Sequence, residues 1–226
     1  METRKCANMT LRERENQIFS KYRSFGEQVI PDGALGQEYE TARPRLLVIL
    51  KEPNDPDGSW LASGGDIRDF GRQYNRPATW NNLARWSALA REPNLTIDKI
   101  DVTDIATRQM HLRRIAVVNL KKFGGASVAK MKEIREHAAK HWILLEDQFK
   151  LYRPDLTISG GVFDILREII GAPEKRDGNN CFRYFEHRDL GICFDFYHPQ
   201  ARLSNKRLFE FLKQRFNYHW HSKLSS

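Results

Sequence analysis

The clearest pattern along the chain is a series of short apolar runs, each followed by polar residues or glycine. The first run, LLVIL at 46–50, contains no polar residue, and similar runs lie at 115–120 and 156–159. Uninterrupted runs of this length are typical of strands that are buried on both faces of a parallel sheet. Two further runs, at 181–185 and 192–197, flank a short turn and predict a β-hairpin or strand pair.

Helical patterns separate these runs. Thr10 and Glu13 have the spacing of a capping box, which predicts a helix from residue 11 to about residue 25. Four more helices are predicted: one capped by Thr79, a long one over 131–149, a short one over 162–170 and a final one capped by Ser204. The polar stretch at 91–114 has no clear assignment.

Alternating strands and helices indicate an α/β fold. We expect a three-layer α/β/α architecture with a central, mostly parallel four-stranded sheet. The chain is expected to form a single domain over 1–226, with an N-terminal helical arm at 1–40 and a polar tail at 217–226.

Lysine and arginine number 37 against 29 acidic residues, which gives a formal charge of +8. Such an excess fits a polyanionic partner, either nucleic acid or an acidic membrane surface. No apolar stretch approaches the roughly 18 residues of a membrane span, so we expect a cytoplasmic protein, not a membrane protein, and a monomer. Three scattered cysteines, Cys6, Cys181 and Cys193, cannot supply a four-cysteine metal site.

Four predicted strands end in turns that are rich in polar residues or glycine. These turns lie at 52–57, 119–125, 159–161 and 198–204. Ligands of open α/β sheets bind at the carboxyl ends of the strands, so we expect these turns to meet in one cleft. An acid, an amide, a glycine pair suited to a phosphate and a histidine would then face one another.

The order of these parts resembles the uracil-DNA glycosylase superfamily, over 45–216. The matching segments are ILKEPND at 49–55, VVNL at 117–120 and HPQARLSN at 198–205. In that family a catalytic turn follows the first strand, a strand ending in Asn reads the base, and a C-terminal loop supplies His and an intercalating side chain. The resemblance implies a monofunctional DNA base glycosylase that flips out its target base and needs no cofactor and no metal.

The resemblance also assigns roles to individual residues. Glu52 is the first candidate for the acid that stabilises the cationic sugar, with Asn54 and Asp55 as alternatives. Asn119 would read the base, and His198 would stabilise the negative charge on the departing base. The candidate DNA contacts are Lys51, Lys121, Lys122, Ser159, Gly160, Gly161, Arg202, Leu203 and Ser204, with Arg202 or Leu203 as the wedge.

The target base is expected to be larger than uracil. Uracil-specific members carry a tyrosine in the catalytic turn that excludes 5-substituted bases, and Asp55 stands at that position. Asp55 would leave room for a substituent and accept its hydrogen bonds, and the loop at 59–77 would line an enlarged pocket. We therefore predict a 5-substituted pyrimidine, such as hydroxymethylated or glycosylated cytosine in phage DNA, and an antiviral role. The alternatives are uracil repair, an inactive nucleic-acid-binding member of the fold, and a hydrolase of free nucleosides or nucleotides.

His137 and His141 have the i, i+4 spacing that can grip zinc. No third ligand is apparent in the sequence, and a solvated helix face is the interpretation that we favour for this pair.

Overall fold

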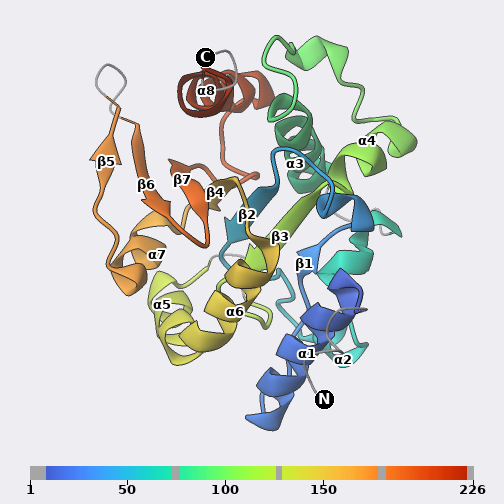
Figure 1. Cartoon of the computed structure of the whole chain (residues 1–226). Helices are drawn as coiled ribbons and strands as arrows, with labels where there is room; N and C mark the ends of the chain where they lie inside the picture. Colours follow the sequence, from blue (N-terminus) through green and yellow to red (C-terminus); the bar gives the residue numbers. More distant parts are fainter. Residues whose placement is uncertain (1–8, 73–76, 126–128, 178–181, 223–226) are drawn as a thin grey trace.

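A computed structural model of the chain (Figure 1) describes residues 9–72, 77–125, 129–177 and 182–222. Its centre is a seven-stranded sheet with the order β1-β3-β2-β4-β7-β6-β5. The strands are β1 (Gly33–Ala34), β2 (Leu46–Leu50), β3 (Ile115–Asn119), β4 (Leu156–Gly160), β5 (Lys175–Arg176), β6 (Arg183–His187) and β7 (Gly191–Phe196).

The sheet is mixed. β2 lies between β3 and β4 and runs parallel to both, and β7 runs parallel to β4. β1, β6 and β5 pair antiparallel at the two outer parts of the sheet. The α/β prediction is confirmed, but the four-stranded, mostly parallel sheet is not: β1 extends one side of β3-β2-β4-β7, β6 and β5 extend the other, and all three pair antiparallel. Leu50 pairs with Asn119, so β2 and β3 end at the same level.

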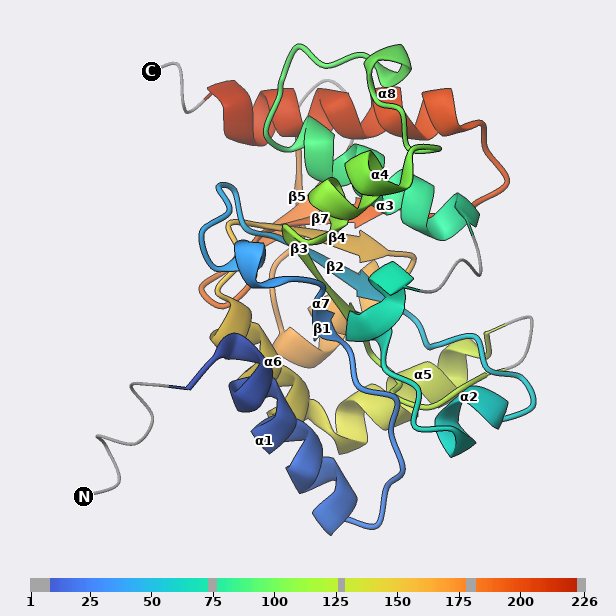
Figure 2. The same ribbon diagram turned by 90° about the vertical axis from the view of Figure 1, so that its right-hand side faces the viewer.

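Helices cover both faces of the sheet (Figure 2). They are α1 (Leu11–Ser24), α2 (Ser59–Ala62), α3 (Pro77–Leu89), α4 (Ile105–Leu112), α5 (Met131–Lys140), α6 (Trp142–Tyr152), α7 (Phe163–Ile170) and α8 (Asn205–Phe216), with shorter helical turns at Gln37–Tyr39, Ile67–Arg72, Ile97–Lys99 and Asn217–His221.

The apolar run of β2 explains this layering. Leu46, Val48 and Leu50 pack in one core with residues of α3 and α8, whereas Leu47 and Ile49 pack in another core with residues of α5, α6 and α7. Successive side chains of a strand point to opposite faces, so an all-apolar run supplies both cores.

Two helix predictions need correction, and a stretch without an assignment proves to contain a helix. The long helix predicted over 131–149 is two helices, α5 and α6, which break at His141 with φ −110° and ψ 21°. The second helix begins at Pro77, before Thr79, because proline is well suited to a first helical position. The unassigned stretch at 91–114 contains α4. The capping box at Thr10 and the Ser204 cap are confirmed.

The described parts of the two ends pack against the rest of the molecule. Within the expected N-terminal helical arm, α1 packs on α6 with Tyr22 fully buried, and β1 joins the sheet. Within the expected polar tail, His219 and His221 are buried. Residues 1–8 and 223–226, and with them Cys6, as well as Cys181, lie outside the described residues; Cys193 is buried. No helix in the described part is long and apolar enough to cross a membrane.

Candidate functional site: a cleft at the carboxyl ends of the strands

A cleft of about 1020 Å³ opens where β2, β3 and β7 end. It brings together the following sequence-predicted residues: Lys51, Glu52, Asn54, Asp55, Asn119, His198 and Arg202. Three of the four expected turns therefore meet in one place. The turn after β4 does not contribute a lining residue.

Glu52 is held by an ion pair. Lys121 Nζ lies 2.6 Å from Glu52 Oε2, and both side chains are buried. A side chain at position 125 would collide with the Glu52 carboxyl group, so Gly125 is required for this close approach. Oε1 accepts no hydrogen bond from a described residue, which leaves it as the oxygen that Glu52 can offer to the cleft.

The other acids of the turn have structural partners. The two Asp55 oxygens accept the backbone N–H groups of Trp60, at 3.0 Å, and Leu61, at 2.9 Å, and so cap α2. Asp57 is exposed and accepts hydrogen bonds from Ser59, which lower the pKa of its carboxyl group. Both Asp55 oxygens are thus already engaged by the backbone of α2, and the expectation that Asp55 accepts hydrogen bonds from a substrate stays a prediction.

Asn54 keeps its side chain available. It is half-buried, lines the cleft and forms an isolated backbone bridge with Gly125. No side-chain hydrogen bond joins it to another described residue. Among the described residues of the turn at 52–57, Asn54 is thus a neutral group that a ligand in the cleft can contact beside Glu52.

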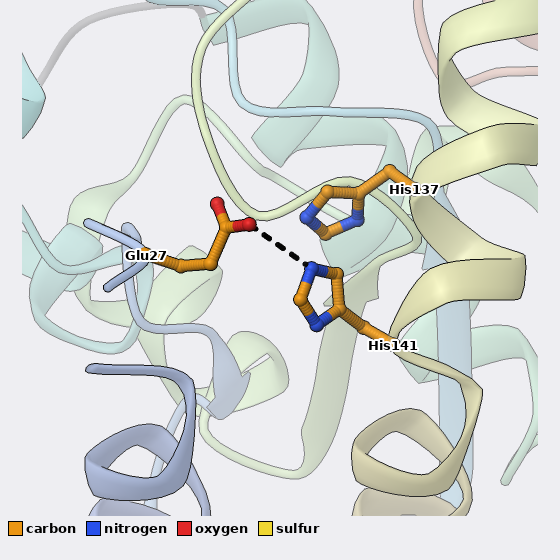
Figure 3. A group of neighbouring side chains, drawn as sticks. All are labelled: Glu27, His137 and His141. Atoms are coloured by element: carbon orange, nitrogen blue, oxygen red, sulfur yellow. Dashed lines mark ion pairs between the residues drawn. The ribbon is translucent and has the colours of Figure 1, made fainter. Parts of the chain in front are cut away.

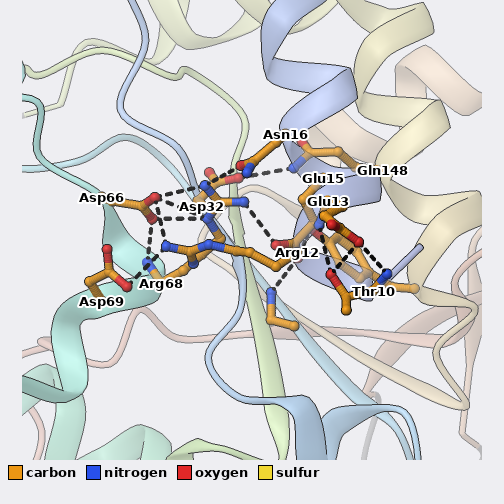
Figure 4. A network of polar contacts seen from close by, with 12 residues as sticks. Thr10, Arg12, Glu13, Glu15, Asn16, Asp32, Asp66, Arg68, Asp69 and Gln148 are labelled. Atoms are coloured by element: carbon orange, nitrogen blue, oxygen red, sulfur yellow. Dashed lines mark hydrogen bonds and ion pairs between the residues drawn. The ribbon is translucent and has the colours of Figure 1, made fainter. Parts of the chain in front are cut away.

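Asn119 is fixed by an acid that sequence analysis missed. Asp32, which is fully buried, accepts the backbone N–H of Asn119 at 2.7 Å and its side-chain Nδ2 at 3.4 Å. Asp32 also pairs with Lys122 Nζ at 2.7 Å and accepts from Gln148 Nε2 at 3.1 Å. Figure 4 shows Asp32 and Gln148 in a network of polar contacts that also includes Glu15 and Arg68. The carboxylate accepts only, so it fixes the Asn119 amide with its nitrogen toward Asp32.

His198 is neutral and has a defined tautomer. Its Nδ1 accepts the backbone N–H of Gln200 at 3.2 Å, so the proton of the neutral ring resides on Nε2. Burial, followed by the positive charge of Lys51, lowers the pKa of His198 to about 4. At neutral pH the ring therefore offers an N–H donor without carrying a charge.

The loop after His198 is held in place by α3. Asn82, a buried residue, donates from Nδ2 to the Pro199 carbonyl at 2.8 Å and to Asn205 Oδ1 at 3.1 Å. Arg202 in this loop is exposed and lines the cleft. Leu203 instead packs against the core, so of the two proposed wedges Arg202 is the one at the cleft.

Several predicted DNA contacts are not available to a phosphate. Lys121 and Lys122 are buried in ion pairs, and the Ser204 hydroxyl accepts Arg207 N–H as the cap of α8. The Ser159 hydroxyl is fully buried and donates to the Phe194 carbonyl at 2.6 Å. Lys121, Lys122 and Ser159 are thus engaged inside the fold, whereas Ser204 is exposed and its hydroxyl can still donate to a phosphate.

The glycine pair after β4 does not form a phosphate cradle. Gly160 lets β4 pack closely, because a side chain there would meet Leu50 Cδ2 at 2.7 Å. Gly161 N–H donates to the Phe196 carbonyl at 2.9 Å and is therefore used within the sheet edge. Lys51 lies beside Gly161 and lines the cleft, with no ion pair to a described residue.

Aromatic side chains that line the cleft are the second feature that sequence analysis missed. Trp60 and Trp80 both line the cleft, together with Ser63 and Ile67 of the glycine-containing loop. Trp60 packs closely against Gly65. Trp60 is half-buried, whereas Trp80 is buried and also belongs to the core that packs on β2. The loop at 59–77 does line the cleft with its described residues, as expected.

No protein-family model matches the chain, and a search of curated proteins finds no relative. The glycosylase resemblance therefore stays a hypothesis that rests on the three motifs and on the chemistry of the cleft.

Proposed function

We propose that the protein is a monofunctional DNA base glycosylase that removes a 5-substituted pyrimidine. The observation that carries this proposal is the meeting of Glu52, Asn119 and neutral His198 in one cleft. Breaking an N-glycosidic bond creates positive charge on the sugar and negative charge on the departing base. A carboxylate and an N–H donor that face the same space supply what each of these charges needs.

Glu52 is the acid that we place beside the sugar. Asp55 and Asp57 have structural partners, so Glu52 is the acid of the turn with an oxygen left for the substrate. Lys121 fixes the other oxygen, which orients the carboxylate. In this position Glu52 Oε1 stabilises the cationic sugar or orients the attacking water.

Asn119 and His198 act on the base. Asp32 fixes which end of the Asn119 amide donates and which end accepts, and cytosine-type and uracil-type edges present opposite patterns. A fixed amide therefore rejects the wrong edge. His198 Nε2–H donates to a base carbonyl oxygen as negative charge develops there, and it can do so at neutral pH because its ring is uncharged.

Residues at the rim of the cleft are proposed to contact the DNA phosphates and to keep the target base flipped out. Arg202 is exposed at the cleft and takes the place of the departed base in the stack. Lys206 and Arg207, which are exposed at the start of α8, and Lys51 are the candidate phosphate contacts. Trp60 and Trp80 supply aromatic faces for the flipped base.

The cleft favours a base larger than uracil. Position 55, where uracil-specific enzymes carry a tyrosine, holds Asp55, whose carboxylate points into the amide groups of α2. The volume of about 1020 Å³ exceeds the need of an unsubstituted pyrimidine. Hydroxymethylated or glycosylated cytosine of phage DNA fits this description, and the biological role we propose is antiviral defence in the cytoplasm.

A substrate panel tests the proposal. The protein is incubated with uracil-containing DNA, with phage-type DNA that carries hydroxymethylated or glycosylated cytosine, and with unmodified DNA, and abasic sites are then cleaved with alkali. We expect alkali-dependent breaks only in the modified DNA, and no borohydride trapping of a lysine adduct. Efficient release of uracil alone would overturn the substrate assignment.

Glu52→Gln tests the acid. Glutamine keeps the volume and an oxygen for Lys121, but removes the charge, so single-turnover excision is expected to fall about 100- to 10,000-fold while DNA affinity is retained. Lys121→Gln is the matched control, because it breaks the same ion pair and leaves the carboxylate. Equal losses in the two variants would mean that Glu52 only anchors the 119–125 segment, and a large loss in Asn54→Ala would move the role to Asn54.

A second candidate function, DNA binding without catalysis, is favoured by the burial of Glu52 in its ion pair with Lys121. In that case the protein binds modified DNA but releases no base from any member of the panel.

A further inference from the structure

Glu27, His137 and His141 form a cluster on the α5–α6 side of the sheet, away from the cleft-lining residues. His137 lies in the last turn of α5, His141 lies at the break between α5 and α6, and Glu27 follows α1. Figure 3 shows both imidazole rings turned toward the Glu27 carboxylate. The interpretation of the two histidines as a solvated helix face is wrong, because both are buried.

We propose that Glu27, His137 and His141 bind a divalent transition metal ion, with zinc as the favoured ion. One ligand atom from each residue can be chosen so that all three lie within 4.8 Å of one another. His141 Nε2 and Glu27 Oε1 are 3.4 Å apart. Two ligands of a tetrahedral zinc ion, with bonds of about 2.0–2.1 Å, are separated by about 3.3 Å. A small movement of the ligands therefore completes the site.

Unpartnered atoms point to a ligand at this place. His137 Nε2 is buried and has no hydrogen-bond partner among the described residues, and the buried His141 Nε2 has only its 3.4 Å ion-pair contact with Glu27 Oε1. Burial of an unpaired ring nitrogen costs free energy, and a bound metal ion removes that cost. Two such nitrogens beside a carboxylate form a donor set that suits zinc, cobalt and nickel better than calcium or magnesium.

The surroundings of His137 match those of a metal ligand. Its other ring nitrogen, Nδ1, lies 3.0 Å from the Leu120 carbonyl oxygen. A donor bond of this kind fixes the tautomer that leaves Nε2 free for a metal. The Phe123 ring packs edge-on against His137 with a centroid distance of 5.0 Å.

The ion would take its third ligand from a partly exposed carboxylate. The Glu27 side chain is 21% exposed, and Lys140 Nζ, which is itself 64% exposed, now lies 2.5 Å from Glu27 Oε1. Lys140 can turn to solvent when a metal ion takes this oxygen. A water molecule would then complete the tetrahedral coordination.

This site would brace the segment beneath the cleft. Leu120 and Phe123, which contact His137, flank Lys121, the residue that holds Glu52. A metal ion would thus tie the segment after α1 to the α5–α6 junction and to the chain that follows β3. The role is structural, so bound metal is expected to change thermal stability before it changes catalysis.

Metal titration of the full, untagged chain tests the site. After chelation and buffer exchange, we expect one equivalent of Zn²⁺ to bind by calorimetry, and one equivalent of Co²⁺ to give the visible absorption of a four-coordinate ion. Zinc at about 100 times its dissociation constant should raise the melting temperature by roughly 5–10 °C. A wild-type protein that binds neither ion overturns the proposal.

Glutamine variants locate the ion. Glu27→Gln, His137→Gln and His141→Gln should each weaken zinc binding at least about 100-fold. His187→Gln is the matched control, because His187 lies in β6 outside the cluster, and it should bind zinc as the wild type does. If a histidine variant does not fold, Glu27→Gln is the deciding test, because Glu27 is partly exposed and glutamine retains its packing. Unchanged zinc binding in Glu27→Gln places the ion elsewhere and overturns the proposal.

Discussion

Two lysines at consecutive positions after β3 end in different surroundings. Lys121 pairs with Glu52, which lines the cleft, and also lies 3.4 Å from Glu133. Lys122 pairs with Asp32 in the interior, where both side chains have no exposed surface. One chain segment therefore supplies a cation to the site and another to the core.

The two pairs differ in what their carboxylates have left to offer. Asp32 accepts from Lys122, Asn119 and Gln148, so its oxygens are taken up by the protein. Glu52 keeps Oε1 without a described partner. An acid that is saturated with donors positions its neighbours, whereas an acid with an oxygen to spare can act on a substrate. The interior pair should thus dominate stability, and the groups of the cleft should dominate chemistry.

Removal of the interior cation should have the largest effect. Lys122→Met leaves Asp32 as a buried charge without its ion-pair partner, and we expect a loss of about 3–5 kcal/mol in the free energy of unfolding. Urea denaturation measures this loss. Lys150→Met is the control, because Lys150 forms an exposed pair with Glu146 and its loss should cost no more than about 1 kcal/mol. Similar costs in the two variants would remove the contrast between interior and surface pairs.

Removal of the cleft donor should affect chemistry and leave stability nearly unchanged. In His198→Asn the asparagine oxygen can still accept the Gln200 N–H, but the Nε2–H donor is lost. Single-turnover excision should fall about 100- to 1,000-fold. His187→Asn is the matched control, because His187 Nδ1 likewise accepts an N–H two residues on, from Asp189. Wild-type excision by the His198 variant would contradict the proposed role.

The pH dependence of stability tests the burial of His198. Its pKa in the folded protein, about 4, lies below the ordinary value of 6.5, so the unfolded chain takes up the proton more readily. The contribution of the neutral His198 ring to the free energy of unfolding is complete above about pH 6.5, and it is lost as the pH falls from there toward 4. His198→Asn should therefore lose less stability than the wild type between pH 7 and pH 4.5 in urea denaturation. Identical losses would show that His198 is not the group that titrates.

Arg202 at the rim should have the smallest effect. Arg202→Ala removes the proposed wedge and with it one positive charge from the DNA-facing rim, so the slope of log affinity for DNA against log salt should become shallower by about 1. Arg188→Ala is the control, since Arg188 is exposed in the β6–β7 turn. A changed slope in the control and not in Arg202→Ala would place the DNA elsewhere.

The sequence alone determined the central strands and the edge of the sheet at which the cleft lies. The run at 46–50 is apolar on both faces, which requires a strand buried between two layers, and the turn at 52–57 must then lie at its carboxyl end. The same reasoning placed Asn119 and His198 at that edge. Local pattern suffices here because strand burial and strand ends follow from consecutive residues.

Only the tertiary structure decided which polar groups are free. Asp32 lies 87 residues from Asn119 and follows no motif, yet it fixes the Asn119 side chain. Asp55 and Glu52 stand three positions apart in one acidic turn, and only their hydrogen-bond partners separate a helix cap from a candidate acid. Burial of His137 and His141 depends on the packing of α1 and of the chain after β3 against them. Hydrogen-bond partners and burial depend on segments distant in the chain, so they cannot be obtained from local sequence patterns.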